Sequence, residues 1–279
     1  MSFMRQTVMQ AMQAGVREND PGPGVSVSTL ARDYPRASVV PQHAHGSDQL
    51  IYASRGVMQV SSGQRLWVIP PQFGLWIPSQ VRHQIRMPET VSMRTLYLRQ
   101  GLTALPRACK VLHVSPLLRE LIFETVRSGK LRNRVRLDCA LRDLLISELD
   151  RARPVPTEVV LPNDSRALRV AQMVIGNLGG RARLPSICAS AGVSVRTLER
   201  AFRREVGTDF ETWRRHVRLM KAVELLVSGS SVKEAAFAVG YEQPNPLVTV
   251  FRATFGVTPK AWVSDLNRTA SRRVGGARL

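Results

Sequence analysis

Two stretches of this chain, LPSICASAGVSVRTLERAFRREVGTDFETW (residues 184–213) and SVKEAAFAVGYEQPNPLVTVFRATFGVTPKAW (residues 231–262), repeat one pattern of apolar residues and glycines. An offset of 49 residues pairs Leu198 with Leu247, Phe202 with Phe251, Arg203 with Arg252, Gly207 with Gly256 and Trp213 with Trp262. Further upstream the offset is 48, and it pairs Ile187 with Ala235, Cys188 with Ala236 and Gly192 with Gly240. A repeat at a fixed spacing indicates one structural unit used twice.

Each copy has the spacing of a helix-turn-helix. A small residue in the first helix lets the second helix cross closely, and a glycine four residues later supplies the positive φ that the turn needs. Cys188 with Gly192 and Ala236 with Gly240 both fit this spacing. Cys188 is therefore interpreted as a small core residue rather than a reactive thiol.

The second helix of each unit should bury one face and present the other to the major groove of DNA. In the first copy Ser194 is the expected N-cap, and Leu198 and Phe202 are the expected buried pair. Arginine suits guanine, and asparagine or glutamine suits adenine. The predicted base contacts are Arg196, Thr197, Arg200, Gln243, Asn245 and Thr249. The predicted phosphate contacts are Arg203, Arg204, Arg214, Arg215, Arg218 and Arg252. For each arginine the alternative is a solvated helix face.

A long helix over residues 210–227 should join the two units. The segment from residue 165 to residue 266, and VKEAAFAVGYEQPNPLVTVFRATFGVTPKAW within it, closely resembles the DNA-binding domain of AraC/XylS transcriptional regulators. The resemblance implies promoter DNA and RNA polymerase as partners and activation as the commoner outcome. Asn245-Pro246 departs from the small or hydroxylated residues often found there, which leaves the readout of this second helix open.

The N-terminal half has a different pattern. Between residues 24 and 100, short apolar and β-branched runs alternate with glycine, proline and serine, which predicts an antiparallel barrel or sandwich. HAHGSDQ (residues 43–49) and IPSQVRHQ (residues 77–84) resemble the two motifs of cupin barrels. Many AraC-type regulators carry such a domain, which implies a small-molecule effector here.

The resemblance to metal cupins maps their ligand positions onto His43, His45, Gln49 and His83. Gln49 stands where those proteins have a glutamate, and a neutral amide weakens a divalent site without abolishing it. Three interpretations stay open: a divalent metal site, a metal-free effector pocket, and a purely structural role. The expected pocket residues are His43, His45, Gln49, His83, Trp67 and Trp76, although aromatic residues in a barrel are more often core.

Two helices should follow the barrel. Ser115-Pro116 is the expected start of the first helix, and the second has Leu137, Leu141, Leu144, Leu145 and Leu149 on one broad face. These leucines either pack on the barrel or also form a homodimer interface. The predicted division of the chain is an extension (1–23), a cupin-like barrel (24–110), a helical pair that is a candidate for dimerisation (111–152), a linker (153–164), an all-α double helix-turn-helix domain (165–266) and a basic tail (267–279).

The composition agrees with a DNA-binding protein. The 279 residues have a formal net charge of +19, which favours a polyanionic partner. There is no run of 18 apolar residues and no evident signal peptide, and the three cysteines lack metal spacing, so we expect a cytoplasmic, non-enzymatic protein. The expected function is sequence-specific transcription regulation, more often activation. The alternatives are a metal-dependent cupin enzyme with a DNA-binding module and a nonspecific DNA binder.

Overall fold

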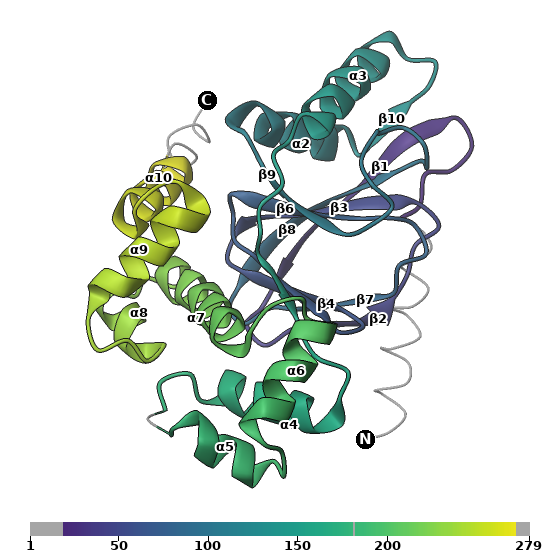
Figure 1. Ribbon diagram of the computed structural model, residues 1–279. Coiled ribbons are helices and arrows are strands. Elements are labelled where there is room, and N and C mark those ends of the chain that lie inside the picture. The colour runs from purple at the N-terminus through teal and green to yellow at the C-terminus, as the bar shows by residue number, and fades with distance from the viewer. Residues whose placement is uncertain (1–18, 181, 272–279) are drawn as a thin grey trace, which may run out of the picture. The chain divides into compact units, whose positions relative to one another are not determined.

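The computed structural model describes residues 19–180 and 182–271, with side chains described as far as residue 266. The chain forms two compact units (Figure 1). The first contains the β-rich N-terminal half up to residue 156, except for residues 64–68. Those five residues group with the second unit, which begins at residue 157. The predicted two-domain architecture, a β domain followed by an all-α domain, is confirmed.

The strands lie in two antiparallel sheets. One has the order β10-β1-β8-β3-β6-β9 and the other β11-β5-β4-β7-β2. The bounds are β1 Val25–Tyr34, β2 Val39–His43, β3 Asp48–Arg55, β4 Met58–Ser62, β5 Arg65–Ile69, β6 Phe73–Ile77, β7 His83–Arg86, β8 Val91–Leu98, β9 Lys110–His113, β10 Lys130–Arg132 and β11 Glu158–Val160. The region predicted to be rich in strands, residues 24–100, contains β1 to β8, whereas β9, β10 and β11 lie outside it.

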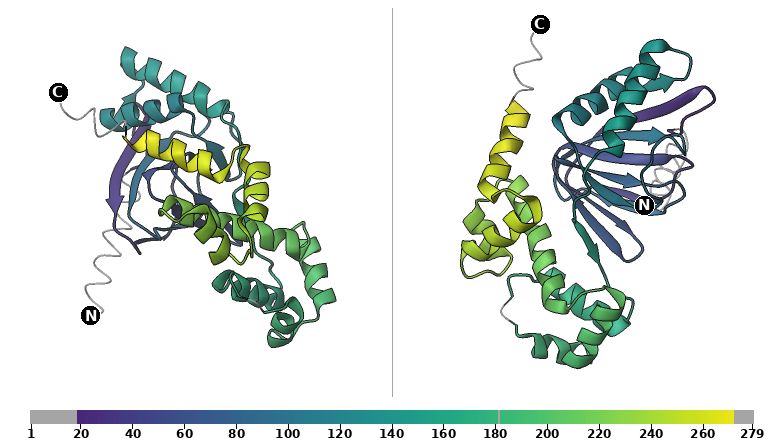
Figure 2. Two further views of the ribbon diagram at one scale, coloured as in Figure 1. Left: turned by 90° about the vertical axis from the view of Figure 1, so that its left-hand side faces the viewer. Right: turned by 45° about the horizontal axis from the view of Figure 1, so that its top comes forward.

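The helical pair covers the outer face of the six-stranded sheet. Helices α2 (Pro116–Ser128) and α3 (Arg136–Asp150) lie along this sheet in all three views (Figures 1 and 2). As predicted, Ser115 is the N-cap of α2, and its side chain accepts a hydrogen bond from the Leu118 N–H. The core beneath the helices contains Val27, Leu50, Tyr52, Trp76, Leu96, Leu98, Leu112, Val114, Leu118, Leu121, Ile122, Leu131, Leu145 and Leu149.

The broad leucine face of α3 divides in two. Leu145 and Leu149 are fully buried in this core, whereas Leu137 is 75% exposed and Leu144 is 46% exposed. The inner half of the face thus packs on the barrel, and the outer half remains on the surface of the monomer. Leu117 of α2 is also exposed, at 47%.

The predicted linker contains the short strand β11. Its residues pair with β5, with Val159 opposite Leu66. Within the second unit β11 also contacts α7 (Phe210–Val227), because the Trp213 indole N–H donates to the Val160 carbonyl and His216 bonds the Glu158 carbonyl. This segment is therefore hydrogen-bonded to the helical unit.

The second unit is all-α apart from β11 and residues 64–68. Besides α7, its helices are α4 Ser165–Gly176, α5 Leu184–Ser190, α6 Val195–Glu205, α8 Val232–Ala238, α9 Pro244–Phe255 and α10 Pro259–Ser271. The long connecting helix has the bounds that the sequence predicts. Helix α10 runs five residues past the predicted domain end at 266, and residues 272–279 of the basic tail lie outside the described residues. No helix of the described part is long and apolar enough to cross a membrane.

Candidate DNA-binding surface and histidine cluster

The two helix-turn-helix units share their turn geometry. Gly192 and Gly240 have φ of +66° and +86°, the left-handed conformation predicted for them. In the first turn the Val193 N–H donates to the Cys188 carbonyl at 3.0 Å, and in the second the Tyr241 N–H donates to the Ala236 carbonyl at 3.0 Å. These two bonds join residues at the same 48-residue offset found in the sequence. Cys188 is 1% exposed, as a structural role requires.

Each unit also has its own aromatic core. In the first, the ring of Phe202 lies 5.1 Å from those of Phe210 and Trp213. In the second, Phe251 lies 4.6 Å from Phe255 and 5.5 Å from Trp262. Because Phe202 and Trp213 are the repeat partners of Phe251 and Trp262, both second helices, α6 and α9, are held by the same kind of contact.

Helix α6 presents a row of arginines on its exposed side. Arg196, Arg200 and Arg203 lie one turn apart and, with Glu199 and Arg204, line a shallow groove. Among the described residues, these three arginines form no ion pair, whereas Arg204 pairs with Glu205. The N-cap Ser194 accepts a bond from the Thr197 N–H at 3.1 Å, as predicted, which starts the helix just before the row. Three guanidinium groups thus remain available for an anionic partner.

Two other polar residues of α6 are already engaged within the protein. The Thr197 hydroxyl lies 2.9 Å from the Ser194 hydroxyl, so Thr197 takes part in the cap. Glu199 accepts a hydrogen bond from the Phe210 N–H at 3.4 Å and is only partly exposed, so it contributes to the start of α7 rather than pointing freely outward.

Helix α9 offers a different and mostly uncharged surface. Gln243 is its N-cap, Pro244 stands in its first turn, and Gln243, Asn245 and Thr249 are exposed. The Thr249 hydroxyl donates to the Asn245 carbonyl at 3.1 Å, which leaves its methyl group for an outside contact. Arg252, near the C-terminal end, is exposed. The two units therefore share their buried residues and differ on the side predicted to face DNA.

The three arginines of α7 fall into two groups. Arg214 pairs with Glu211 at 2.8 Å, and Arg215 is exposed and donates to the Thr212 hydroxyl at 2.9 Å. Arg218 is half-buried, its guanidinium lies over the ring of Tyr241 at 5.3 Å, and burial lowers its pKa. Arg218 thus contacts the turn of the second unit, unlike the exposed Arg215 predicted alongside it.

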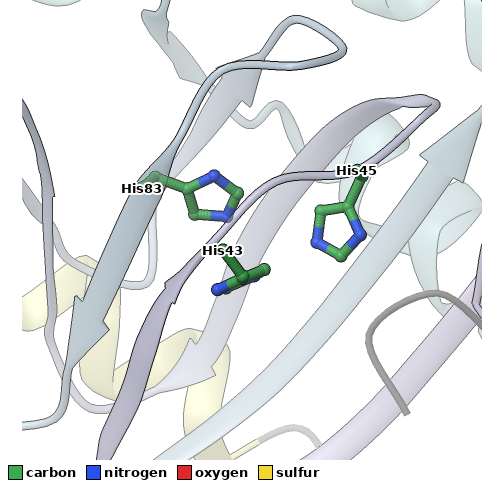
Figure 3. Close-up of side chains that lie close together, drawn as sticks. All are labelled: His43, His45 and His83. Atoms are coloured by element: carbon green, nitrogen blue, oxygen red, sulfur yellow. The ribbon is translucent and has the colours of Figure 1, made fainter. Parts of the chain in front are cut away.

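In the β domain, the three histidines of the sequence motifs lie together (Figure 3). His43 at the end of β2 is opposite His83 on β7, and His45 follows two residues after the strand. Ring centroids are 4.3 Å apart for His43 and His83, 4.9 Å for His43 and His45, and 5.7 Å for His45 and His83. One ring nitrogen from each lies within 4.8 Å of the others.

The hydrogen bonds of two rings define their tautomers. Nδ1 of His43 lies 2.7 Å from the Pro41 carbonyl, and Nδ1 of His83 lies 2.9 Å from the Val81 carbonyl. A carbonyl only accepts, so both Nδ1 atoms bear the proton and both Nε2 atoms keep a lone pair. Burial lowers the pKa of His43 and lowers that of His83 to about 3, so His83 is neutral at physiological pH.

Sequence reasoning missed two neighbours of the cluster. Tyr97 on β8 lies 4.8 Å, ring to ring, from His45 and is the cross-strand partner of Gln49, and burial raises its pKa. Asp20 accepts bonds from the Gly46 N–H at 2.9 Å and from the Ser47 hydroxyl, beside His45. Nothing in their local sequence marks either residue, since strand pairing and chain folding bring them there.

Of the two predicted pocket tryptophans, Trp76 lies on the other face of its sheet from Gln49. Trp76 is opposite Leu50, whereas the neighbouring residue Gln49 pairs with Ile77 and Tyr97. Side chains alternate along a strand, so Trp76 points away from Gln49, into the core beneath α2 and α3, where its indole donates to the Pro106 carbonyl. Trp67 is buried in β5, opposite Glu158 of β11.

Comparison with known proteins accounts for both units. A family model described as the AraC-like ligand binding domain matches residues 24–154, and one described as a helix-turn-helix domain matches residues 187–265. The HTH-type transcriptional regulator NimR of Escherichia coli (strain K12) is 26% identical over 226 residues, which cover 81% of this chain and 83% of NimR. The HTH-type transcriptional activator RhaR of Pectobacterium carotovorum subsp. carotovorum (strain PC1) is 24% identical over 263 residues, which cover 85% of this chain and 90% of RhaR.

Among solved structures, a crystal structure of ToxT from Vibrio cholerae O395 aligns with 86% of this chain and 98% of its own, at 12% identity and a TM-score of 0.37. Similarity at that level supports no argument about function.

Proposed function

We propose that α6 and α9 read two adjacent segments of promoter DNA. The chain belongs to the AraC/XylS family of transcriptional regulators, with an AraC-like ligand-binding domain and a helix-turn-helix DNA-binding domain. The observation that carries this proposal is the row of exposed arginines without ion pairs on α6, beside a helix of the same build with uncharged polar residues. Arginine donates two hydrogen bonds to guanine, whereas asparagine and glutamine suit adenine.

Base contacts are assigned to six polar side chains, namely the exposed Arg196, Arg200, Gln243, Asn245 and Thr249 and the partly exposed Thr197. Phosphate contacts are assigned to Arg203, Arg204, Arg214, Arg215 and Arg252. Arg218 was also predicted to contact phosphate, and its stacking on Tyr241 favours a supporting role instead.

The effector is proposed to bind inside the β domain at His43, His45, Gln49 and His83, beside Tyr97. The buried polar atoms there support this placement, because an amide oxygen of Gln49 and Nε2 of His83 have no hydrogen-bond partner among the described residues. Buried polar groups are otherwise nearly always paired. The exposed leucines of α2 and α3 support a homodimer, and a regulator of promoters would work in the cytoplasm with RNA polymerase as its partner. RhaR is called an activator, which favours activation here.

The direct experiment is footprinting with the full-length protein on DNA upstream of its own gene and its neighbours, with and without candidate effectors. We expect protection of two adjacent major-groove segments on one face of the DNA, changed by the true effector. Absence of a protected site on any of this DNA would contradict the proposal.

Replacing Arg200 with Ala tests the assignment of base contacts. The variant should lose about 10- to 100-fold in affinity for the target, and that loss should vanish when one base pair of the site is changed. The matched control is Arg215→Ala, since Arg215 is also exposed but is assigned to phosphate. Affinities are measured by fluorescence anisotropy on a panel of single-base variants of the site. A uniform loss for Arg200→Ala would reassign it to phosphate.

A further inference from the structure

We propose that His43, His45 and His83 bind one divalent transition-metal ion through three imidazole nitrogens. The proposal specifies what the effector site of the proposed function binds. It depends on the proposed function only for the location of that site. Metal binding itself is measured without DNA, so its failure would leave the DNA-binding assignment intact.

The first argument is the convergence of the three rings. Three histidines from β2, the following loop and β7 place one ligand nitrogen each within 4.8 Å of the others. Imidazole ligands of zinc lie about 2.0–2.1 Å from the ion, so nitrogens in a tetrahedral site are about 3.4 Å apart. The largest separation therefore exceeds the tetrahedral value by about 1.4 Å, which small rotations of the three side chains would close.

The second argument is the orientation of the hydrogen bonds. Metal-bound histidines almost always donate their other N–H to a carbonyl or carboxylate, which holds the ring in place. Nδ1 of His43 and of His83 each meet a backbone carbonyl, of Pro41 and Val81 respectively. This leaves Nε2 as the free ligand atom on both rings.

The third argument is an unpaired donor atom in the protein interior. His83 is 1% exposed, and its Nε2 has no hydrogen-bond partner among the described residues. Buried polar groups are nearly always paired, so an unpaired one is unfavourable. A metal ion at the centre of the cluster would satisfy that lone pair.

The donor set also predicts which ions bind. Among the described residues no carboxylate or thiol belongs to the cluster, and the buried Gln49 lies opposite Tyr97, whose ring contacts His45. Imidazole suits zinc, copper, nickel and cobalt, whereas magnesium, calcium and manganese prefer carboxylate oxygens. We therefore expect Co²⁺, Ni²⁺ and Zn²⁺ to bind, and a large excess of Mg²⁺ not to displace them.

The experiment uses the full chain, freed of metal with a chelator and titrated with Co²⁺ while its visible absorption is recorded. One Co²⁺ per chain is expected, and Zn²⁺ but not Mg²⁺ should displace it. His83→Gln should weaken binding by more than about 100-fold, beyond the 10- to 100-fold typical for loss of a supporting partner. The matched control is His113→Gln, because His113 is exposed on β9 and lies outside the cluster.

Circular dichroism checks that each variant is folded. A second measurement needs no variant: X-ray absorption of the Zn²⁺-loaded wild-type protein should show about three imidazole nitrogens around the ion. Failure of the wild-type protein to bind Co²⁺ or Zn²⁺, equal binding by folded His83→Gln, or a sulfur shell from a cysteine would each overturn the proposal.

Discussion

At the scale of single residues, the repeat places equivalent residues of the two helix-turn-helix units in different surroundings. Gly192 and Gly240 occupy the same place in the two turns and have similar positive φ values. A Cβ atom at Gly192 would meet no heavy atom within 4 Å, whereas at Gly240 it would lie 2.4 Å from the Leu178 carbonyl oxygen and 2.9 Å from the Arg218 guanidinium. The second turn is therefore tightly packed, and the first is open.

Alanine at these two glycines should therefore have unequal effects. Gly192→Ala should lower the free energy of unfolding by about 1–2 kcal/mol, the cost of a left-handed conformation for a residue with a Cβ atom. Gly240→Ala should cost about 1–3 kcal/mol more, because the backbone of residue 178 must move. Urea unfolding of both full-length variants measures the difference. Equal losses would show that the Leu178 carbonyl yields without cost.

At the scale of elements, α3 has one side in the core and another on the surface. Leu145 is fully buried against the sheet, while Leu137 and Leu144 remain exposed. Helix α7 behaves differently, because β11 covers part of it through the backbone carbonyls of Glu158 and Val160. Helix α3 thus leaves an apolar surface available to another chain. The polar groups of Trp213 and His216 on α7, by contrast, have hydrogen-bond partners within their own unit.

Charging the exposed side of α3 tests the proposed dimer. Leu137→Lys combined with Leu144→Lys should weaken self-association by about 100-fold or more, because each buried leucine contributes about 1.5–3 kcal/mol. Sedimentation velocity over a range of concentrations measures the change. Leu145→Ala is the contrasting variant and should cost about 2–5 kcal/mol of stability. An unchanged sedimentation profile for the double variant would place the dimer interface elsewhere.

The contact between α7 and β11 should depend on pH through His216. Burial lowers the pKa of His216, and the bond to the Glu158 carbonyl offsets this only in part. The unfolded chain takes up a proton at about pH 6.5, but the folded protein does so only at lower pH. Stability contributed by neutral His216 is thus complete above about pH 6.5 and is lost as the pH falls toward the folded value. The free energy of unfolding, measured in urea from pH 8 to 5, should depend less on pH in His216→Gln than in the wild type. If the two proteins lose the same free energy of unfolding over this pH range, the prediction is wrong.

At the scale of the whole molecule, the net charge of +19 is spread over the chain. From residue 163 onward there are 19 Lys and Arg against 9 Asp and Glu, and before it 21 against 12. Charge alone therefore does not locate the DNA-binding surface. It raises affinity for any DNA, whereas specificity depends on the few side chains that reach the bases.

Salt should separate these two contributions. Each arginine that contacts a phosphate adds about 0.9 to the slope of log affinity against log salt concentration. Arg203→Ala and Arg252→Ala should each reduce that slope by about this amount on specific and random DNA alike. Preference for the target over random DNA should persist at high salt. A preference that disappears with salt would indicate a nonspecific DNA binder.

The sequence alone was sufficient for the helical unit. Its helices, turns and buried residues follow from local rules: apolar residues every three or four positions, a serine N-cap at Ser194, and glycines where φ is positive. The fixed 48- and 49-residue offsets then predicted that the second unit would repeat the first. The grouping of the three histidines also followed from motifs, although only by resemblance.

Tertiary structure alone decided what depends on strand register and on contacts between distant segments. It placed Tyr97 and Asp20 beside the histidines, put Trp76 on the opposite face of its sheet, and divided the leucines of α3 into buried and exposed halves. A shift of one residue along a strand exchanges the two faces of a sheet, and local sequence does not specify that register. For this reason the DNA-binding scaffold could be predicted from the chain, whereas the surroundings of the histidine cluster had to be observed.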